Sequence, residues 1–80
     1  MKDQVVEAIR DVFEPSMIDE SALTEVDGHV YGTVQVIGSP VFDALDDVRR
    51  QHRLWDKLIA VLGGDALNVG PVVLQPGRRG

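Results

Sequence analysis

The sequence predicts a single α+β domain with the element order α-β-β-α-β, in which two helices pack on one face of a three-stranded sheet. Apolar residues recur at helical spacing in two segments, an Asp-Gly pair separates two alternating runs, and a short apolar run follows the second helix. With 80 residues, 44% of them hydrophobic, the chain has enough apolar surface for one core. Stacking both helices on one sheet face is the simplest packing that buries both helical stripes.

The first helix is expected over residues 4–13. Asp3 is its predicted N-cap, since a short polar side chain satisfies free backbone N–H groups at a helix start. Pro15 ends the helix, because proline disfavours a helical conformation in the preceding Glu14. The apolar face comprises Val5, Ile9, Val12 and Phe13, with Val6 and Ala8 beside it.

Two strands are expected next, over residues 22–26 and 30–37, as a β-hairpin. Asp27-Gly28 joins them, and this pair favours a turn in which both residues take positive φ. In the second strand one face should meet the core and the other should be wetter. The predicted core face holds Val30, Val34 and Val36, and the opposite face holds Tyr31, Thr33 and Gln35.

The main helix is expected from about Asp46 to Leu62. Ser39-Pro40 indicates a short turn over residues 40–44 before it, and Gly63-Gly64 provides a stop after it. Its predicted apolar stripe consists of Leu45, Val48, His52, Trp55, Ile59 and Leu62, widened by Leu58 and Val61.

The last strand is expected over residues 69–74. Because Pro71 has no N–H group, either this strand should lie at a sheet edge or Pro71 should fall among its first residues. The folded domain is therefore predicted to cover residues 1–75, followed by a flexible tail over residues 76–80.

Composition argues against most catalytic chemistry. The chain has no cysteine, two histidines and a formal net charge of −5. No phosphate-binding glycine loop, acid-base pair or metal-ligand spacing is recognisable, so we predict a protein that is not an enzyme and holds no metal or cofactor. We also expect a cytoplasmic protein, because no segment approaches a signal peptide or a membrane span.

Four of the eight basic residues fall on the main helix: Arg49, Arg50, Arg53 and Lys57. Arg50, Arg53 and Lys57 are spaced to share one exposed face. This is either a solvated helix face, with Arg50 paired to Asp46, or a docking surface for an acidic partner or a phosphate backbone. His52 lies at the margin of the apolar stripe, where it is either a packed residue or a polar contact for that partner.

The segment from Ser39 to Leu58 resembles the signature of the BolA-like family. Members have a strand that ends in serine, a phenylalanine three residues later, and a helix with Arg-His-Arg followed by an aliphatic and an aromatic residue. The positions that match are Ser39, Phe42, Val48, Gln51, His52, Arg53, Leu54, Trp55 and Leu58. The element order also agrees with the family core, which is similar to a class II KH fold.

This resemblance implies association with monothiol glutaredoxins, shared iron-sulfur clusters and iron-sulfur trafficking, and in some members DNA binding and gene regulation. The family's C-terminal histidine would fall near Gly70 and is absent, and the Gly-x-x-Gly loop of KH domains is missing. We therefore expect a binding module that docks a protein partner, by resemblance a monothiol glutaredoxin or iron-sulfur trafficking factor. Its predicted contacts are Arg49, Arg50, His52, Arg53 and Lys57. The alternative is a nucleic-acid-binding regulatory protein that uses the same basic face.

Overall fold

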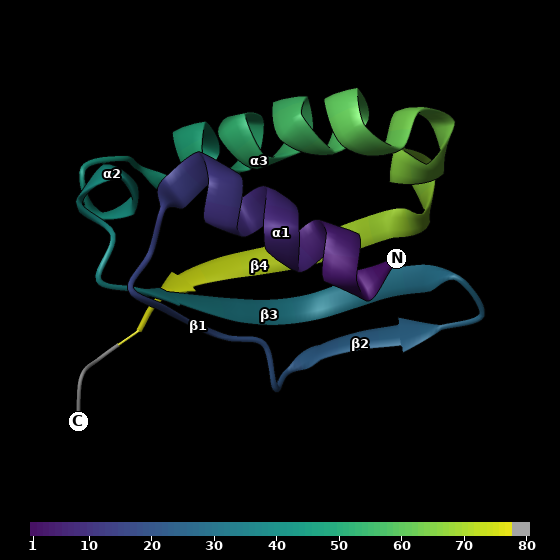
Figure 1. The fold of residues 1–80 in the computed structure, drawn as a ribbon, viewed down its shortest axis with the longest axis horizontal. Coiled ribbons are helices and arrows are strands. Elements are labelled where there is room, and N and C mark those ends of the chain that lie inside the picture. The colour runs from purple at the N-terminus through teal and green to yellow at the C-terminus, as the bar shows by residue number, and fades with distance from the viewer. Residues whose placement is uncertain (78–80) are drawn as a thin grey trace.

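The computed structural model describes residues 1–77, which form three α-helices, one 3-10 helix and a four-stranded sheet (Figure 1). In chain order the elements are α1 (Lys2–Phe13), β1 (Met17–Asp19), β2 (Leu23–Val26), β3 (His29–Ile37), α2 (Pro40–Asp43), α3 (Asp47–Leu62), the 3-10 helix η1 (Gly63–Asn68) and β4 (Val69–Pro76). Helices α1 and α3 lie side by side over the same face of the sheet. The α+β class predicted from the sequence is confirmed.

Strand β3 is the centre of the sheet. Both β1 and β2 pair with it antiparallel, while β4 pairs with it parallel. Gln35 and Val36 pair with β1 and β4 at once, so β1 and β2 share one edge of β3 and β4 takes the other. The sheet thus has four strands instead of the expected three, because two short strands, β1 and β2, occupy one edge of β3. Strand β1 was not predicted, because three residues are too few to show an alternating pattern.

The β2–β3 hairpin forms as predicted. Asp27 and Gly28 both have positive φ, at 50° and 78°. Strand β3 also needs glycine at position 32, where φ is 130° and a Cβ atom would overlap the carbonyl oxygen of Ala22. The hairpin then directs Val30, Val34 and Val36 toward the helices, and all three are buried.

The core lies between the sheet and the two long helices. Helix α1 contributes its whole apolar face to it. The buried set comprises Val5, Val6, Ala8, Ile9 and Phe13 of α1, Leu23 of β2, the three valines of β3, Phe42 of α2, Leu54 and Leu58 of α3, Ala66 of η1, and Val69, Val72 and Leu74 of β4.

The start of α1 is capped from a distant part of the chain. Asp3 was predicted as the N-cap, but the helix begins one residue before it, and the backbone N–H of Lys2 donates to Oε1 of Glu25 at 2.7 Å. This hydrogen bond is the main cause of a lowered pKa for Glu25. At the other end, Glu14 takes the left-handed conformation and its N–H donates to Arg10, so α1 ends as predicted before Pro15.

The buried face of α3 differs from the predicted stripe. Its fully buried residues are Leu54 and Leu58, with Trp55 and Leu62 partly buried beside them. Val48, His52, Ile59 and Val61, all placed in the predicted stripe, are exposed. The stripe was centred roughly a quarter turn away from the true buried face, at about 100° per residue. Apolar side chains occur both on the buried face of α3 and on the exposed surface beside it. Periodicity alone therefore centred the predicted stripe on the wrong side chains.

Strand β4 lies at a sheet edge, as Pro71 predicted. It extends to Pro76, and the N–H of Gly77 donates to the carbonyl of Val36. These two residues therefore belong to the folded domain, although the tail was predicted to start at residue 76. The rest of the predicted tail, residues 78–80, lies outside the described part of the chain. No helix within residues 1–77 is long and apolar enough to cross a membrane.

Candidate docking surface on helix α3

The residues that precede α3 form a packed corner. The backbone N–H of Phe42 donates to Oγ of Ser39 at 3.1 Å, and the Ser39 hydroxyl donates to the carbonyl of Phe13. The Phe42 ring meets the Phe13 ring edge to face, with centroids 5.1 Å apart. Ser39 and Phe42 are both fully buried. Two residues of the sequence signature, Ser39 and Phe42, therefore have a structural role: they pack the segment before α3 against the end of α1.

Arg50 is part of the same corner. Its guanidinium carbon lies 3.9 Å from the centre of the Phe42 ring, and its Nε donates to the carbonyl of Phe42 at 2.9 Å. It pairs with Asp47 at 3.3 Å, not with Asp46 as predicted, and its side chain is only 13% exposed. The structure thus does not place Arg50 on an exposed face with Arg53, and its charge is already engaged within the chain.

Lys57 is engaged as well. Its ammonium group lies 3.5 Å from the carboxylate of Asp11 on α1, so this cation joins the two long helices. Arg50 and Lys57 both lie on the side of α3 that faces α2 and α1. Only part of the predicted basic surface is therefore available to a partner.

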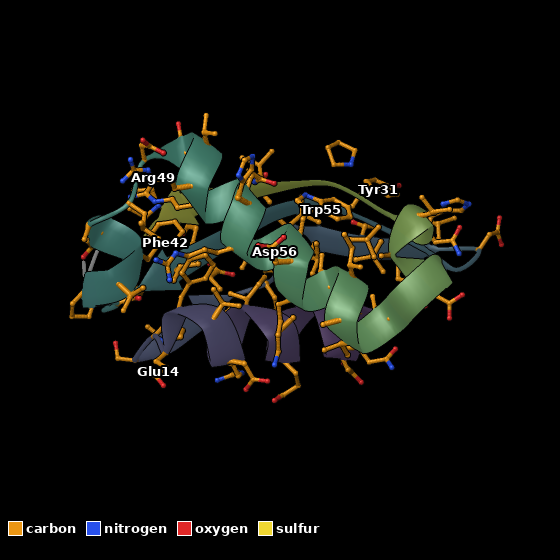
Figure 2. The ribbon with its side chains drawn as sticks, turned by 90° about the horizontal axis from the view of Figure 1, so that it is seen from above. Glu14, Tyr31, Phe42, Arg49, Trp55 and Asp56 are labelled. Carbon is orange, nitrogen blue, oxygen red and sulfur yellow. The ribbon has the colours of Figure 1, made fainter. Side chains whose placement is uncertain are left out.

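The remaining cations, Arg49 and Arg53, lie on the exposed surface of α3 next to Arg50 and Lys57. Arg49 approaches Asp46 only at 4.0 Å and has a 74% exposed side chain, a geometry that contributes little to stability. His52 and Arg53 are exposed, and within residues 1–77 neither side chain has a hydrogen bond or ion pair. Figure 2, which looks down on the helices, shows Arg49 near the start of α3 and Asp56 further along it.

Apolar side chains share this surface. Val48 is 65% exposed and Ile59 is 59% exposed. We define the outer face of α3 by six exposed residues: Val48, Arg49, His52, Arg53, Asp56 and Ile59. Sequence analysis had assigned Val48 and Ile59 to the core and gave Asp56 no role. The available signal was the width of the apolar pattern, which exceeds what one buried face can hold.

Trp55 marks the border between the outer face and the core. Its Nε1 donates to Oε1 of Gln51 at 3.2 Å, and Nε2 of Gln51 donates to the carbonyl of Val72 at 2.8 Å. These bonds tie α3 to the open edge of β4. The Trp55 ring covers Gly70, where a Cβ atom would lie 3.3 Å from Cζ2. Two further signature residues, Gln51 and Trp55, thus hold α3 against the sheet.

Gly70 is also the position at which the family resemblance would place a cluster-ligating histidine. A side chain there would displace the Trp55 ring, and φ at Gly70 is 123°. Within residues 1–77, no three side chains of His, Cys, Asp or Glu are grouped as a metal site requires. His29 is exposed at the β2–β3 turn, on a different element from His52. The residues present do not fit an iron-sulfur cluster, and no step of the function is derived through one.

Comparisons with known proteins give no family assignment: no family model, curated protein or solved structure matches the chain.

Proposed function

We propose that this chain is a non-enzymatic binding module, of BolA-like type with a class II KH-like arrangement, that docks a protein partner on the outer face of α3. By resemblance the partner is a monothiol glutaredoxin or another iron-sulfur trafficking factor. The observation that carries the proposal is the state of His52. It is exposed between Arg49 and Arg53, beside Val48 and Ile59, instead of being packed in the core.

The surface combines the two features that protein interfaces need. Val48 and Ile59 supply apolar contact area. Arg49 and Arg53 supply positive charge that no close ion pair within residues 1–77 neutralises. An arginine is suited to an acidic partner, because its planar donors pair with carboxylates at two points. The partner surface is therefore expected to be acidic around an apolar centre.

A titration with a purified monothiol glutaredoxin tests the proposal. Amide NMR shifts should change at Val48, Arg49, His52 and Arg53, and Arg53→Glu should weaken binding about tenfold by reversing an attraction. Arg10→Glu is the matched control, since Arg10 is an exposed helical arginine on α1. No binding, shifts confined to other elements, or equal losses in both variants would reject docking on this face.

Nucleic-acid binding through the same helix is the weaker alternative. With Arg50 and Lys57 engaged by Asp47 and Asp11, two arginines remain, and the formal net charge is −5. Two phosphate contacts would give a slope of about −1.8 for log K against log salt. A filter-binding titration with duplex DNA at two salt concentrations measures that slope. Tight binding with a steep slope would favour this alternative over the protein partner.

A further inference from the structure

The outer face of α3 carries a seam with the spacing of a helix–helix interface. Val48, His52, Trp55, Ile59 and Leu62 follow one another at intervals of four, three, four and three residues. This spacing averages 3.5 residues, as in helices that pack along their length. In this chain the seam turns away from the core at Val48, His52 and Ile59 and is only partly buried at Trp55 and Leu62.

A charged row runs beside the seam. Arg49, Arg53 and Asp56 are spaced at four and three residues, so they lie along one edge of it. The Asp56 side chain has no hydrogen bond or ion pair within residues 1–77, and the Arg49 side chain has only the 4.0 Å approach to Asp46. The row is thus basic in its first half and acidic in its second half.

We propose that a second copy of this chain occupies the outer face, so that two α3 helices pack antiparallel around a twofold axis. In an antiparallel pair, Val48 lies opposite Ile59 of the second copy, and His52 lies opposite Trp55. Asp56 of the second copy then projects between Arg49 and Arg53. The twofold axis repeats every contact, so each subunit supplies the acid for the other's arginines.

Charge complementarity selects this occupant and this orientation. The antiparallel pair brings the same edge of both helices together, so Asp56 of one copy meets the arginines of the other. In a parallel pair the two charged rows would lie on opposite sides of the interface and would not contact each other. The inference goes beyond the proposed function, because it needs only this chain. Since both occupants use the same face, self-association and partner docking compete.

Sedimentation equilibrium on the purified chain, from about 10 μM to about 1 mM, tests the proposal. The wild type should show a monomer–dimer equilibrium. Asp56→Arg should raise the dimer dissociation constant about tenfold or more, because the introduced guanidinium would face Arg49 and Arg53. Adding Arg49→Asp to that variant should recover part of the affinity, because it rebuilds one of the two charge pairs in reverse while Arg53 still faces the introduced arginine. Ile59→Asn, which removes apolar area without changing charge, should also weaken the dimer.

Glu7→Arg is the matched control, since it makes the same charge change on an exposed position of α1. It should leave the dissociation constant unchanged, and circular dichroism should show that all variants fold. A chain that is monomeric throughout, equal effects of Asp56→Arg and Glu7→Arg, or no recovery in the double variant would overturn the proposal. Asp56→Arg also separates it from partner docking, because an acidic partner would not bind this variant more weakly.

Discussion

Helices α1 and α3 have similar amphipathic sequences, but they use their apolar residues differently. Five residues of α1 are buried, and they form one continuous face. Helix α3 is longer, at 16 residues against 12, yet only Leu54 and Leu58 are buried. Two of its exposed apolar residues, Val48 and Ile59, lie on its outer face. The contrast shows that α1 uses its apolar residues for the fold, whereas α3 packs on the core with one face and leaves Val48 and Ile59 exposed on the other, the face on which we propose docking.

Truncation of a buried side chain should have the largest effect on stability, and it tests which residues of α1 and α3 belong to the core. Leu54→Ala should lower the free energy of unfolding by about 2–5 kcal/mol, because it leaves a cavity under α3, and Ile9→Ala in α1 should cost a similar amount. Ile59→Ala should change it by less than about 0.5 kcal/mol, since that side chain is exposed. Urea unfolding followed by circular dichroism, at low protein concentration, measures all three.

The decisive pair is Leu54→Ala and Ile59→Ala. Equal losses in both would mean that Ile59 is packed in the core, as the sequence pattern had suggested. The outer face would then lose its apolar centre, and both proposals for α3 would fail with it.

Arg50 and Arg53 show the same contrast between a packed and an exposed side chain of α3. Arg50→Met should destabilise the chain by about 1.5–3 kcal/mol, because it removes a charged hydrogen bond to the Phe42 carbonyl as well as the contact with the Phe42 ring. Arg53→Met, the matched change on the outer face, should stay within about 0.5 kcal/mol. Thermal and urea unfolding provide the measurement. A large loss from Arg53→Met would show that this arginine is structural.

The local features of the fold follow from the sequence. The Asp27-Gly28 turn, the Ser39-Pro40 helix start and the end of α1 before Pro15 each depend on backbone preferences of one or two residues. Alternation placed Val30, Val34 and Val36 in the core, because a strand has only two faces to choose between.

The orientation of α3 could not be predicted in the same way. Its rotation depends on what lies beneath it: Trp55 over Gly70, Gln51 on the Val72 carbonyl, and Lys57 on Asp11. These contacts join segments distant in the chain, so no local pattern reports them. The basic cluster was found by counting charges, but whether each charge was free or engaged depended on the same tertiary contacts.

The helix starts offer a finer version of the comparison. Helix α3 is capped locally, since Asp46 accepts from the N–H of Arg49 at 2.8 Å. Helix α1 is capped by Glu25 of β2, which lies 23 residues from Lys2 in the chain. Asp46→Ala should therefore cost about 1 kcal/mol by loosening α3 alone, whereas Glu25→Gln should weaken the attachment of α1 to the sheet.

Acid should remove the stability that the Glu25 carboxylate gives to the start of α1. This is the smallest effect that we expect. The hydrogen bond from Lys2 holds the pKa of Glu25 below its ordinary value of 4.5, so the unfolded chain binds this proton more readily than the folded chain. The contribution is therefore complete at neutral pH and is lost as the pH falls through the lowered pKa. Glu25→Gln should melt below the wild type at pH 7, and the gap should narrow as the pH falls below 4.5. A gap that stays constant with pH would show that the Glu25 carboxylate does not cap α1, and the helix would then be anchored by its buried face alone.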